Sequence, residues 1–179
     1  GFTLSPQKPD VLYASIELEK RNGAVYKSED RGSSWKKMSD LSLGYGTGPH
    51  YYQELFASPH KFDRLYLMNV RILTSEDGGK TFVELTERSK HSDNHAIAFR
   101  EDDPNYLLVG TDAGIYESFD LAKTWKYHKN LPITQFYKVA VNNAYPFYHI
   151  FGGTQDNGSA GGPSRTDERQ GIRLSLIHI

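Results

Sequence analysis

The chain has 179 residues, of which 37% are hydrophobic and 13% aromatic, and its formal net charge is -1 at pH 7. This composition suits a β-rich globular protein with a sizeable core. The small net charge gives no electrostatic reason to expect a nucleic acid or an anionic membrane surface as a partner. No apolar run is long enough to insert into a membrane as a helix. The sequence has no cysteine, which excludes disulfide and thiolate chemistry but leaves the compartment open.

An eight-residue pattern, Ser-x-Asp-x-Gly-x-Ser/Thr-aromatic, occurs at 28–35 and 75–82 and, with Ala122 in place of Gly, at 118–125. The copies begin 47 and 43 residues apart, a period typical of solenoids and propellers. Ser and Asp accept hydrogen bonds from nearby backbone N–H groups and Gly adopts a positive φ, so each copy predicts a tight turn. Ala122 predicts a strained or differently shaped third turn. The residues expected to be structural are Ser28, Asp30, Gly32, Trp35, Ser75, Asp77, Gly79, Phe82, Ser118, Asp120 and Trp125.

Short segments of alternating hydrophobicity surround each copy, and turn residues separate them. In chain order, the expected strands are 11–15, 24–26, 35–38, 52–57, 65–68, 71–73, 82–85, 96–100, 106–109, 115–117, 125–128, 137–141 and 148–151. They supply three strands of one blade, two whole blades and the opening two strands of a fourth. Four strands per repeat are typical of a β-propeller. The predicted fold class is all-β, a β-propeller of four-stranded antiparallel blades present as an incomplete arc.

The partial propeller is expected to span residues 1–172, with about three blades. The Gly/Ser-rich stretch 158–166 predicts a long loop. Residues 173–179 contain an apolar run with no turn residues and no place in the repeat, and 174–179 resembles a translated sequencing adapter. We interpret 173–179 as a non-native tail and exclude it from the functional argument.

The three copies match the Asp-box of BNR-repeat proteins, which include sialidases, xyloglucanase-type glycoside hydrolases and the Vps10 domain of sortilin. Three further segments resemble bacterial sortilin/Vps10-like proteins, which are often labelled glycosyl hydrolase. They are 130–141 with Asn-Leu-Pro, 153–158 with Gly-x-Gln-Asp-Asn-Gly, and 161–166 with Gly-Gly-Pro-Ser-Arg-Thr. This resemblance implies an extracytoplasmic protein, whether secreted, periplasmic or at the cell surface. It also implies a glycan or peptide ligand. The blade count is below that of any closed propeller, so we expect a parent chain to supply the remaining blades, and we assign no cofactor.

Antiparallel strands alternate in direction, so the loops joining second to third and fourth to first strands of a blade share one edge. The eight-residue turns lie at the opposite edge. The resemblance places ligands at the former edge, which we call the ligand edge, and its aromatic, amide, carboxylate and guanidinium groups suit a sugar or peptide. The predicted ligand-binding residues are Tyr51, Tyr52, Arg71, His91, Asp93, His95, Gln135, Gln155 and Asn157.

The motif His91-x-Asp93-x-His95 contains side chains that suit zinc. Alternate residues of an extended chain also point the same way, so the three could instead bond neighbouring loops or a ligand. The matching segment of the resembling family is His-Asp-His-His-like, and Asn94 replaces one His here. We therefore assign no metal.

Glycoside hydrolysis needs two carboxylates roughly 5 to 10 Å apart. Asp112 and Asp156 occupy matching slots of adjacent blades at the ligand edge and are the candidate catalytic residues, with Asp93 as a third candidate carboxylate. Asp112 and Asp156 could instead simply close a turn. Three functions stay open. The first is a sortilin/Vps10-like BNR-repeat propeller that binds glycan or peptide, the second a glycoside hydrolase acting on a polysaccharide, and the third a structural assembly platform. Whether the chain is an enzyme is left open.

Overall fold

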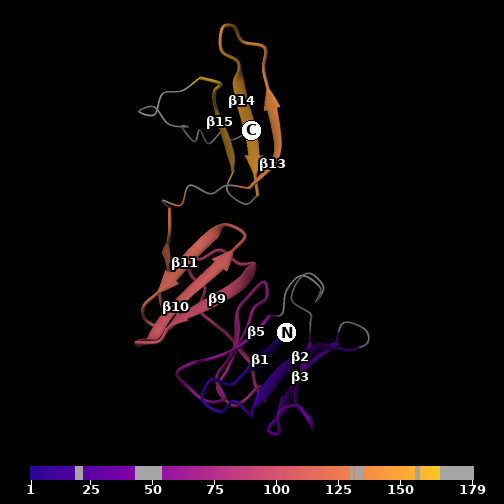
Figure 1. Ribbon diagram of the computed structural model, residues 1–179. Helices are drawn as coiled ribbons and strands as arrows, with labels where there is room; N and C mark the ends of the chain where they lie inside the picture. Colours follow the sequence, from indigo (N-terminus) through magenta and orange to yellow (C-terminus); the bar gives the residue numbers. More distant parts are fainter. Residues whose placement is uncertain (19–21, 43–53, 130, 132–134, 156–157, 166–179) are drawn as a thin grey trace. The chain divides into compact units, whose positions relative to one another are not determined.

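The computed structural model describes residues 1–18, 22–42, 54–129, 131, 135–155 and 158–165. They belong to two compact units, Gly1–His128 and Lys129–Ile179, and each is described by itself. Regular structure in the described ranges consists of β-strands in four antiparallel sheets of three or four strands (Figure 1). The same ranges contain no helix long and apolar enough to cross a membrane. The all-β prediction is confirmed.

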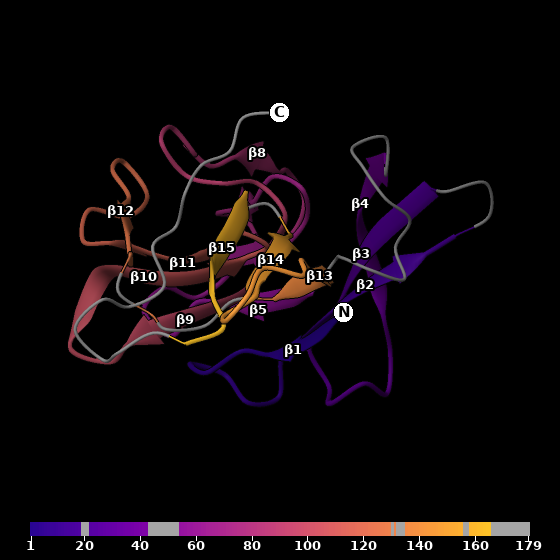
Figure 2. The ribbon, with the colours of Figure 1, turned by 90° about the horizontal axis from the view of Figure 1, so that it is seen from above.

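The first unit contains three four-stranded sheets, in each of which the strands lie in chain order. The first sheet is β1 (Phe2–Leu4), β2 (Leu12–Glu17), β3 (Asn22–Ser28) and β4 (Lys36–Ser42), seen side by side in Figure 2. The second is β5 (Leu55–Ala57), β6 (Leu65–Leu67), β7 (Leu73–Ser75) and β8 (Val83–Glu84). The third is β9 (Asn94–Arg100), β10 (Asp103–Thr111), β11 (Gly114–Ser118) and β12 (Lys126–Tyr127).

Strand β1 is a strand that the sequence pattern missed, since only three strands were expected in the first blade. Phe2 pairs with Ala14 and Leu4 pairs with Leu12, which completes the sheet. With three residues, of which Phe2 and Leu4 are more than half exposed, β1 is too short to show a periodic pattern.

The second unit contains one sheet, formed by β13 (Phe136–Val141), β14 (His149–Thr154) and β15 (Ser159–Pro163). The prediction of a long loop at 158–166 is therefore wrong for the residues that form β15. The glycine content that suggested a loop has a packing reason at Gly161, because a Cβ there would lie 2.9 Å from the Phe151 ring. Glycine in this strand makes room for the cross-strand aromatic ring.

Hydrophobic side chains fill the space between neighbouring sheets of the first unit. The cluster between the first and second sheets contains Val11, Tyr13, Val25, Leu55, Leu65 and Leu67. The cluster between the second and third sheets contains Tyr66, Met68, Ile72, Ile97, Leu107, Val109 and Ala122. Strand β6 supplies alternate residues to the two clusters, so its sheet is buried on both faces. This packing holds the loops at each sheet edge at fixed spacing.

Polar contacts also join the first two sheets, at the edge that carries the eight-residue turns. The carboxylate of Asp63 accepts a hydrogen bond from Lys27 Nζ at 2.9 Å and another from the hydroxyl of Tyr13. The backbone oxygen of Asp63 accepts the N–H of Gly78, in the second turn, at 2.9 Å. Burial, together with the bond to Asp63, raises the pKa of Tyr13 above its usual value.

The three eight-residue turns share one hydrogen-bond pattern. In each turn the first Ser hydroxyl donates to the Asp carboxylate at 2.8 to 2.9 Å and accepts the N–H four residues on at 2.8 to 2.9 Å. The Asp carboxylate also accepts the backbone N–H and the hydroxyl of the Ser or Thr that precedes the aromatic residue. The three carboxylates are thus bonded within their own turns.

Ala122 keeps the shape of the third turn. Its φ is 68°, against 89° for Gly32 and 88° for Gly79 at the same position, and its N–H reaches Ser118 Oγ as in the other copies. The sequence predicted that the third turn would be either strained or differently shaped, and the second of these predictions is wrong. The residue instead adopts the left-handed conformation, which is unfavourable for a side chain with a Cβ.

These turns predict an acid-dependent loss of stability. Hydrogen bonds from the Ser34 hydroxyl and N–H, followed by Ser28, lower the pKa of Asp30 from 3.8 to about 2. Because the folded pKa lies below the unfolded one, the stabilisation is complete above about pH 4 and is lost as the pH falls towards 2. We expect Asp30→Asn to remove about one proton from the uptake on acid unfolding. Urea titrations at pH 2 to 5 measure this uptake, and an unchanged pH slope would contradict the role of Asp30.

Candidate functional site

Three loops meet at the ligand edge of the first unit. They are the β6–β7 loop, the β8–β9 loop and the β10–β11 turn, which the strand directions place together. Backbone hydrogen bonds join them, because Asp93 N donates to Val70 O at 3.0 Å and Asp112 N donates to Asp93 O at 3.3 Å. The eight-residue turns lie at the other end of the same strands, as the sequence analysis expected.

His95 and Asp112 form the closest side-chain pair among the predicted site residues of these loops. The distance from His95 Nε2 to Asp112 Oδ1 is 2.6 Å, and their side chains are 36% and 15% exposed. A carboxylate can only accept, so this contact places a hydrogen on Nε2 of the ring. The pair is therefore oriented by its own bond and is still reachable from solvent.

A β-bulge places His95. Gly110 pairs with Ala96, but the next residue, Thr111, pairs with Asn94, so His95 is the extra residue of strand β9. Bulges bend a strand locally and redirect a side chain, and they are frequent beside functional sites. Here the bulge lies directly next to the turn that carries Asp112.

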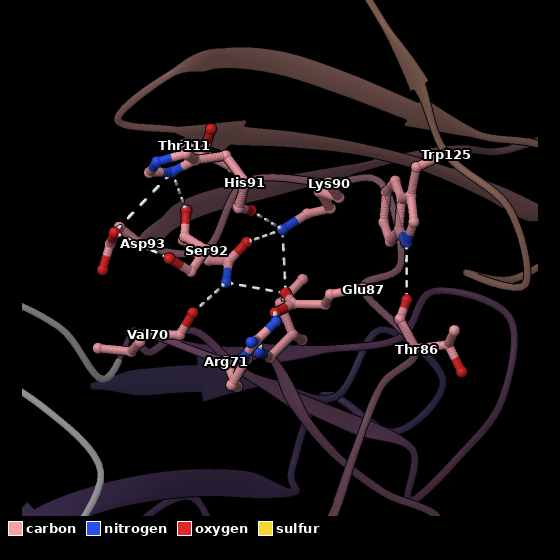
Figure 3. A network of polar contacts seen from close by, with 12 residues as sticks. Val70, Arg71, Thr86, Glu87, Lys90, His91, Ser92, Asp93, Thr111 and Trp125 are labelled. Atoms are coloured by element: carbon pink, nitrogen blue, oxygen red, sulfur yellow. Dashed lines mark hydrogen bonds and ion pairs between the residues drawn. The ribbon is translucent and has the colours of Figure 1, made fainter. Parts of the chain in front are cut away.

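His91 and Asp93 form a second, looser pair on the same loop. His91 Nδ1 lies 3.9 Å from Asp93 Oδ2 and 2.9 Å from Ser92 O, and the Ser92 hydroxyl donates to Asp93 at 3.0 Å (Figure 3). Asp93 has a φ of 60°, a conformation that Asp tolerates better than most residues. In the described part of the chain, no three His, Asp or Glu side chains are grouped closely enough to hold a metal ion.

A buried ion pair lies beneath these exposed groups. Lys90 Nζ donates to Glu87 Oε1 at 2.9 Å, to His91 O at 2.8 Å and to Asn94 Oδ1 (Figure 3). The side chains of Lys90 and Glu87 are 0% and 1% exposed. An ammonium group has three donors, so Lys90 uses all of them. Burial lowers the pKa of Lys90 below 10.5, against the opposing charge of Glu87.

Asn94 connects this ion pair to the neighbouring loop. Its amide Nδ2 lies 3.0 Å from Asn69 O, 3.0 Å from Val70 O and 2.9 Å from Glu87 Oε1, and the residue is fully buried. Asn94 therefore points into the protein, and it ties strand β9 to the loop before β7.

Arg71 lies at the border between the buried and exposed layers. Its Nη1 is 3.3 Å from Glu87 Oε2, while its side chain is 48% exposed. Glu87 thus contacts two cations, of which only Arg71 reaches the surface. This arrangement fixes a guanidinium group at the ligand edge.

The remaining predicted site residues fall elsewhere. Four of them lie outside the described residues, namely Tyr51, Tyr52, Asp156 and Asn157. The distance between the Asp112 and Asp156 carboxylates is therefore not tested. Gln135 and Gln155 belong to the second unit, where Gln155 N donates to Gln135 O at 3.2 Å. The further description of the candidate site is therefore confined to the ligand-edge loops of the first unit.

The sequence pattern does not indicate Glu87 and Lys90 as site residues, and it gives no role to Asn94. Glu87 and Lys90 stand in a stretch rich in charge, with Glu84 and Arg88 beside them. Such a stretch usually marks a solvated loop. Their spacing of three residues was a weak signal of an ion pair, but nothing in it indicated burial.

Comparisons with known proteins place the chain among β-propellers. No family model matches it. A probable oligoxyloglucan-reducing end-specific xyloglucanase from Neosartorya fischeri is 26% identical over an alignment of 148 residues, and the match covers 74% of this chain and 18% of that protein.

Three solved structures share the fold. A GH74 enzyme from Niastella koreensis gives a TM-score of 0.59 at 16% identity, over 92% of this chain and 28% of that one. The GH74 xyloglucanase from Xanthomonas campestris gives 0.57 at 19% identity, over 91% and 28%. YCF48 from Cyanidioschyzon merolae gives 0.52 at 16% identity, over 93% and 53%. The chain therefore has a propeller-like fold and spans about a quarter to a half of these propeller structures.

Proposed function

We propose that this chain is part of a β-propeller protein of the xyloglucanase type and that its ligand edge contacts a β-glucan related to xyloglucan. The observation that carries the proposal is the similarity to the Neosartorya fischeri xyloglucanase over 74% of the chain. The matching GH74 structures support the fold behind it. Of the functions that the sequence left open, the glycoside hydrolase is now favoured over the sortilin/Vps10-like binding protein, which stays a prediction.

The geometry of the loops suits a neutral sugar. His95 with Asp112 and His91 with Asp93 offer donors and acceptors next to each other, and Arg71 adds a fixed guanidinium. Sugar hydroxyl groups need both kinds of partner. The acidic groups of the edge are already accompanied by His or a cation, so a polyol is accommodated without an unpaired charge.

Catalysis is the more specific part of the proposal, because it assigns roles to individual carboxylates. Hydrolysis would need Asp112 and a second carboxylate roughly 5 to 10 Å away, for which Asp156 stays the candidate. An extracytoplasmic location and further blades supplied by a longer parent chain complete the proposal.

The test is calorimetric titration of a xyloglucan oligosaccharide into the chain. We expect saturable binding that weakens at least tenfold in His95→Ala, which removes the hydrogen-bonding ring, and in Asp112→Asn, which replaces one acceptor oxygen with an NH2 donor. The matched control is Asp102→Asn, since Asp102 is exposed at the other edge and its carboxylate accepts hydrogen bonds from the Arg100 guanidinium. Absence of binding, or equal binding by all variants, rejects the proposal. Binding of a peptide library instead would favour the sortilin-like alternative.

A further inference from the structure

The bulge at His95 needs a device that holds it, because the pairing of β9 with β10 shifts register at this point. Asn94 pairs with Thr111 on one side of His95, and Ala96 pairs with Gly110 on the other. The strand could otherwise slide by one residue, which would turn the His95 side chain to the opposite face. Something must therefore fix the register at Asn94.

The contacts of Asn94 supply that restraint. The two hydrogens of its amide Nδ2 are shared among three acceptors, the carbonyls of Asn69 and Val70 and the carboxylate of Glu87, and its oxygen accepts from Lys90. Its own backbone N–H donates to Asn69 O at 3.1 Å. A slipped register would break all of these bonds in a buried place, where unsatisfied polar groups are costly.

The restraint also reaches Asp112. Asp93, adjacent to Asn94, accepts the backbone N–H of Asp112 and donates its own N–H to Val70 O. The loop that carries Asn69 and Val70 therefore supports both partners of the His95 and Asp112 pair.

We propose that Asn94 is a positioning residue, which locks the β-bulge so that the His95 ring stays bonded to Asp112 at the ligand edge. The consequence for sugar affinity rests on the proposed function, but the positioning itself does not. Asn94 touches no ligand because it is fully buried. Its effect is transmitted through the position of His95.

The experiment compares the Asn94→Ser variant with the unsubstituted protein by NMR of the ring nitrogens in ¹⁵N-histidine-labelled samples. The chain has seven His residues, and a His95→Gln variant assigns the His95 signals. In the unchanged protein we expect the separate signals of one tautomer with a hydrogen on Nε2. In Asn94→Ser, which cannot reach both carbonyls, we expect averaged tautomer signals and an at least tenfold weaker affinity for the xyloglucan oligosaccharide.

A control separates positioning from general loss of stability. Asp63→Asn removes a polar contact at the opposite edge, where Asp63 joins Lys27 and Tyr13, and should leave the His95 signals unchanged. If Asn94→Ser does not fold, Asn94→Ala, which loses the donors without burying a new polar group or a second carboxylate beside Glu87, gives the same readout. Folded Asn94 variants with unchanged His95 signals overturn the proposal. Altered His95 signals in a chain that binds no oligosaccharide uphold the positioning role and reject the proposed function.

Discussion

Lys90→Met should lower the free energy of unfolding of the first unit by about 3 kcal/mol, since removing one partner of a buried ion pair leaves an uncompensated charge. In this variant the Glu87 side chain, which is 1% exposed, would have only the Arg71 guanidinium as a neighbouring cation. The distance from Arg71 Nη1 to Glu87 Oε2 is 3.3 Å. Arg71 is half exposed, so it compensates only in part, and the loss should lie near the low end of the 3 to 5 kcal/mol typical of such changes.

The measurement is urea unfolding followed by tryptophan fluorescence. Both Trp residues, Trp35 and Trp125, belong to the first unit, so the signal reports that unit alone. Trp125 is a direct probe, because Lys90 Nζ lies 5.4 Å from its ring centroid. The midpoint and slope give the free energy by linear extrapolation.

A double variant decides whether the charge pair itself is responsible. In Lys90→Met with Glu87→Gln neither charge remains, and replacing both members of a buried pair is often close to neutral. We expect the double variant to be more stable than Lys90→Met alone, although Asn94 and the carbonyl of His91 lose a donor. Equal or additive losses would show that the hydrogen bonds, and not the charges, carry the effect.

The sequence predicted the repeat well because its signal is local. A Ser and an Asp two residues apart determine their own turn through hydrogen bonds to the adjoining backbone, and the three turns share these bonds. Strand alternation then followed from simple geometry, and it brought Asp93, Asp112 and Val70 to one edge. The predicted edge therefore required no knowledge of distant contacts.

The parts that sequence missed depend on contacts between distant residues. Gly161 looks like a loop residue until Phe151 is placed beside it. Lys90 looks solvated until Trp125 and Tyr116 cover it. The bulge at His95 is likewise invisible, because it depends on which residue of β10 each residue of β9 pairs with. Burial and register are properties of the packed sheets, and a pattern of single residues does not contain them.

Gly79→Ala should be the most damaging single-methyl change in the eight-residue turns, and Gly32→Ala is its matched control. Both glycines have a φ near 89°. An Ala at either position would have to adopt the left-handed conformation, which destabilises the folded state by about 1 to 2 kcal/mol. The new methyl groups meet different surroundings. At Gly32 the nearest atom would be 3.4 Å away, on Leu12, whereas at Gly79 a Cβ would lie 2.7 Å from Val25 Cγ1.

Val25 has no room to yield, because it is fully buried between the first and second sheets. Overpacking of such a site costs typically 1 to 3 kcal/mol, so Gly79→Ala should lose about that much more than Gly32→Ala in urea unfolding. Adding Val25→Ala to Gly79→Ala should remove the clash, and the double variant should lose less than the sum of its single changes. Equal losses at Gly79 and Gly32 would mean that backbone conformation alone requires the glycines. The third turn already tolerates a methyl group at this position, because Ala122 is packed in the cluster between the second and third sheets.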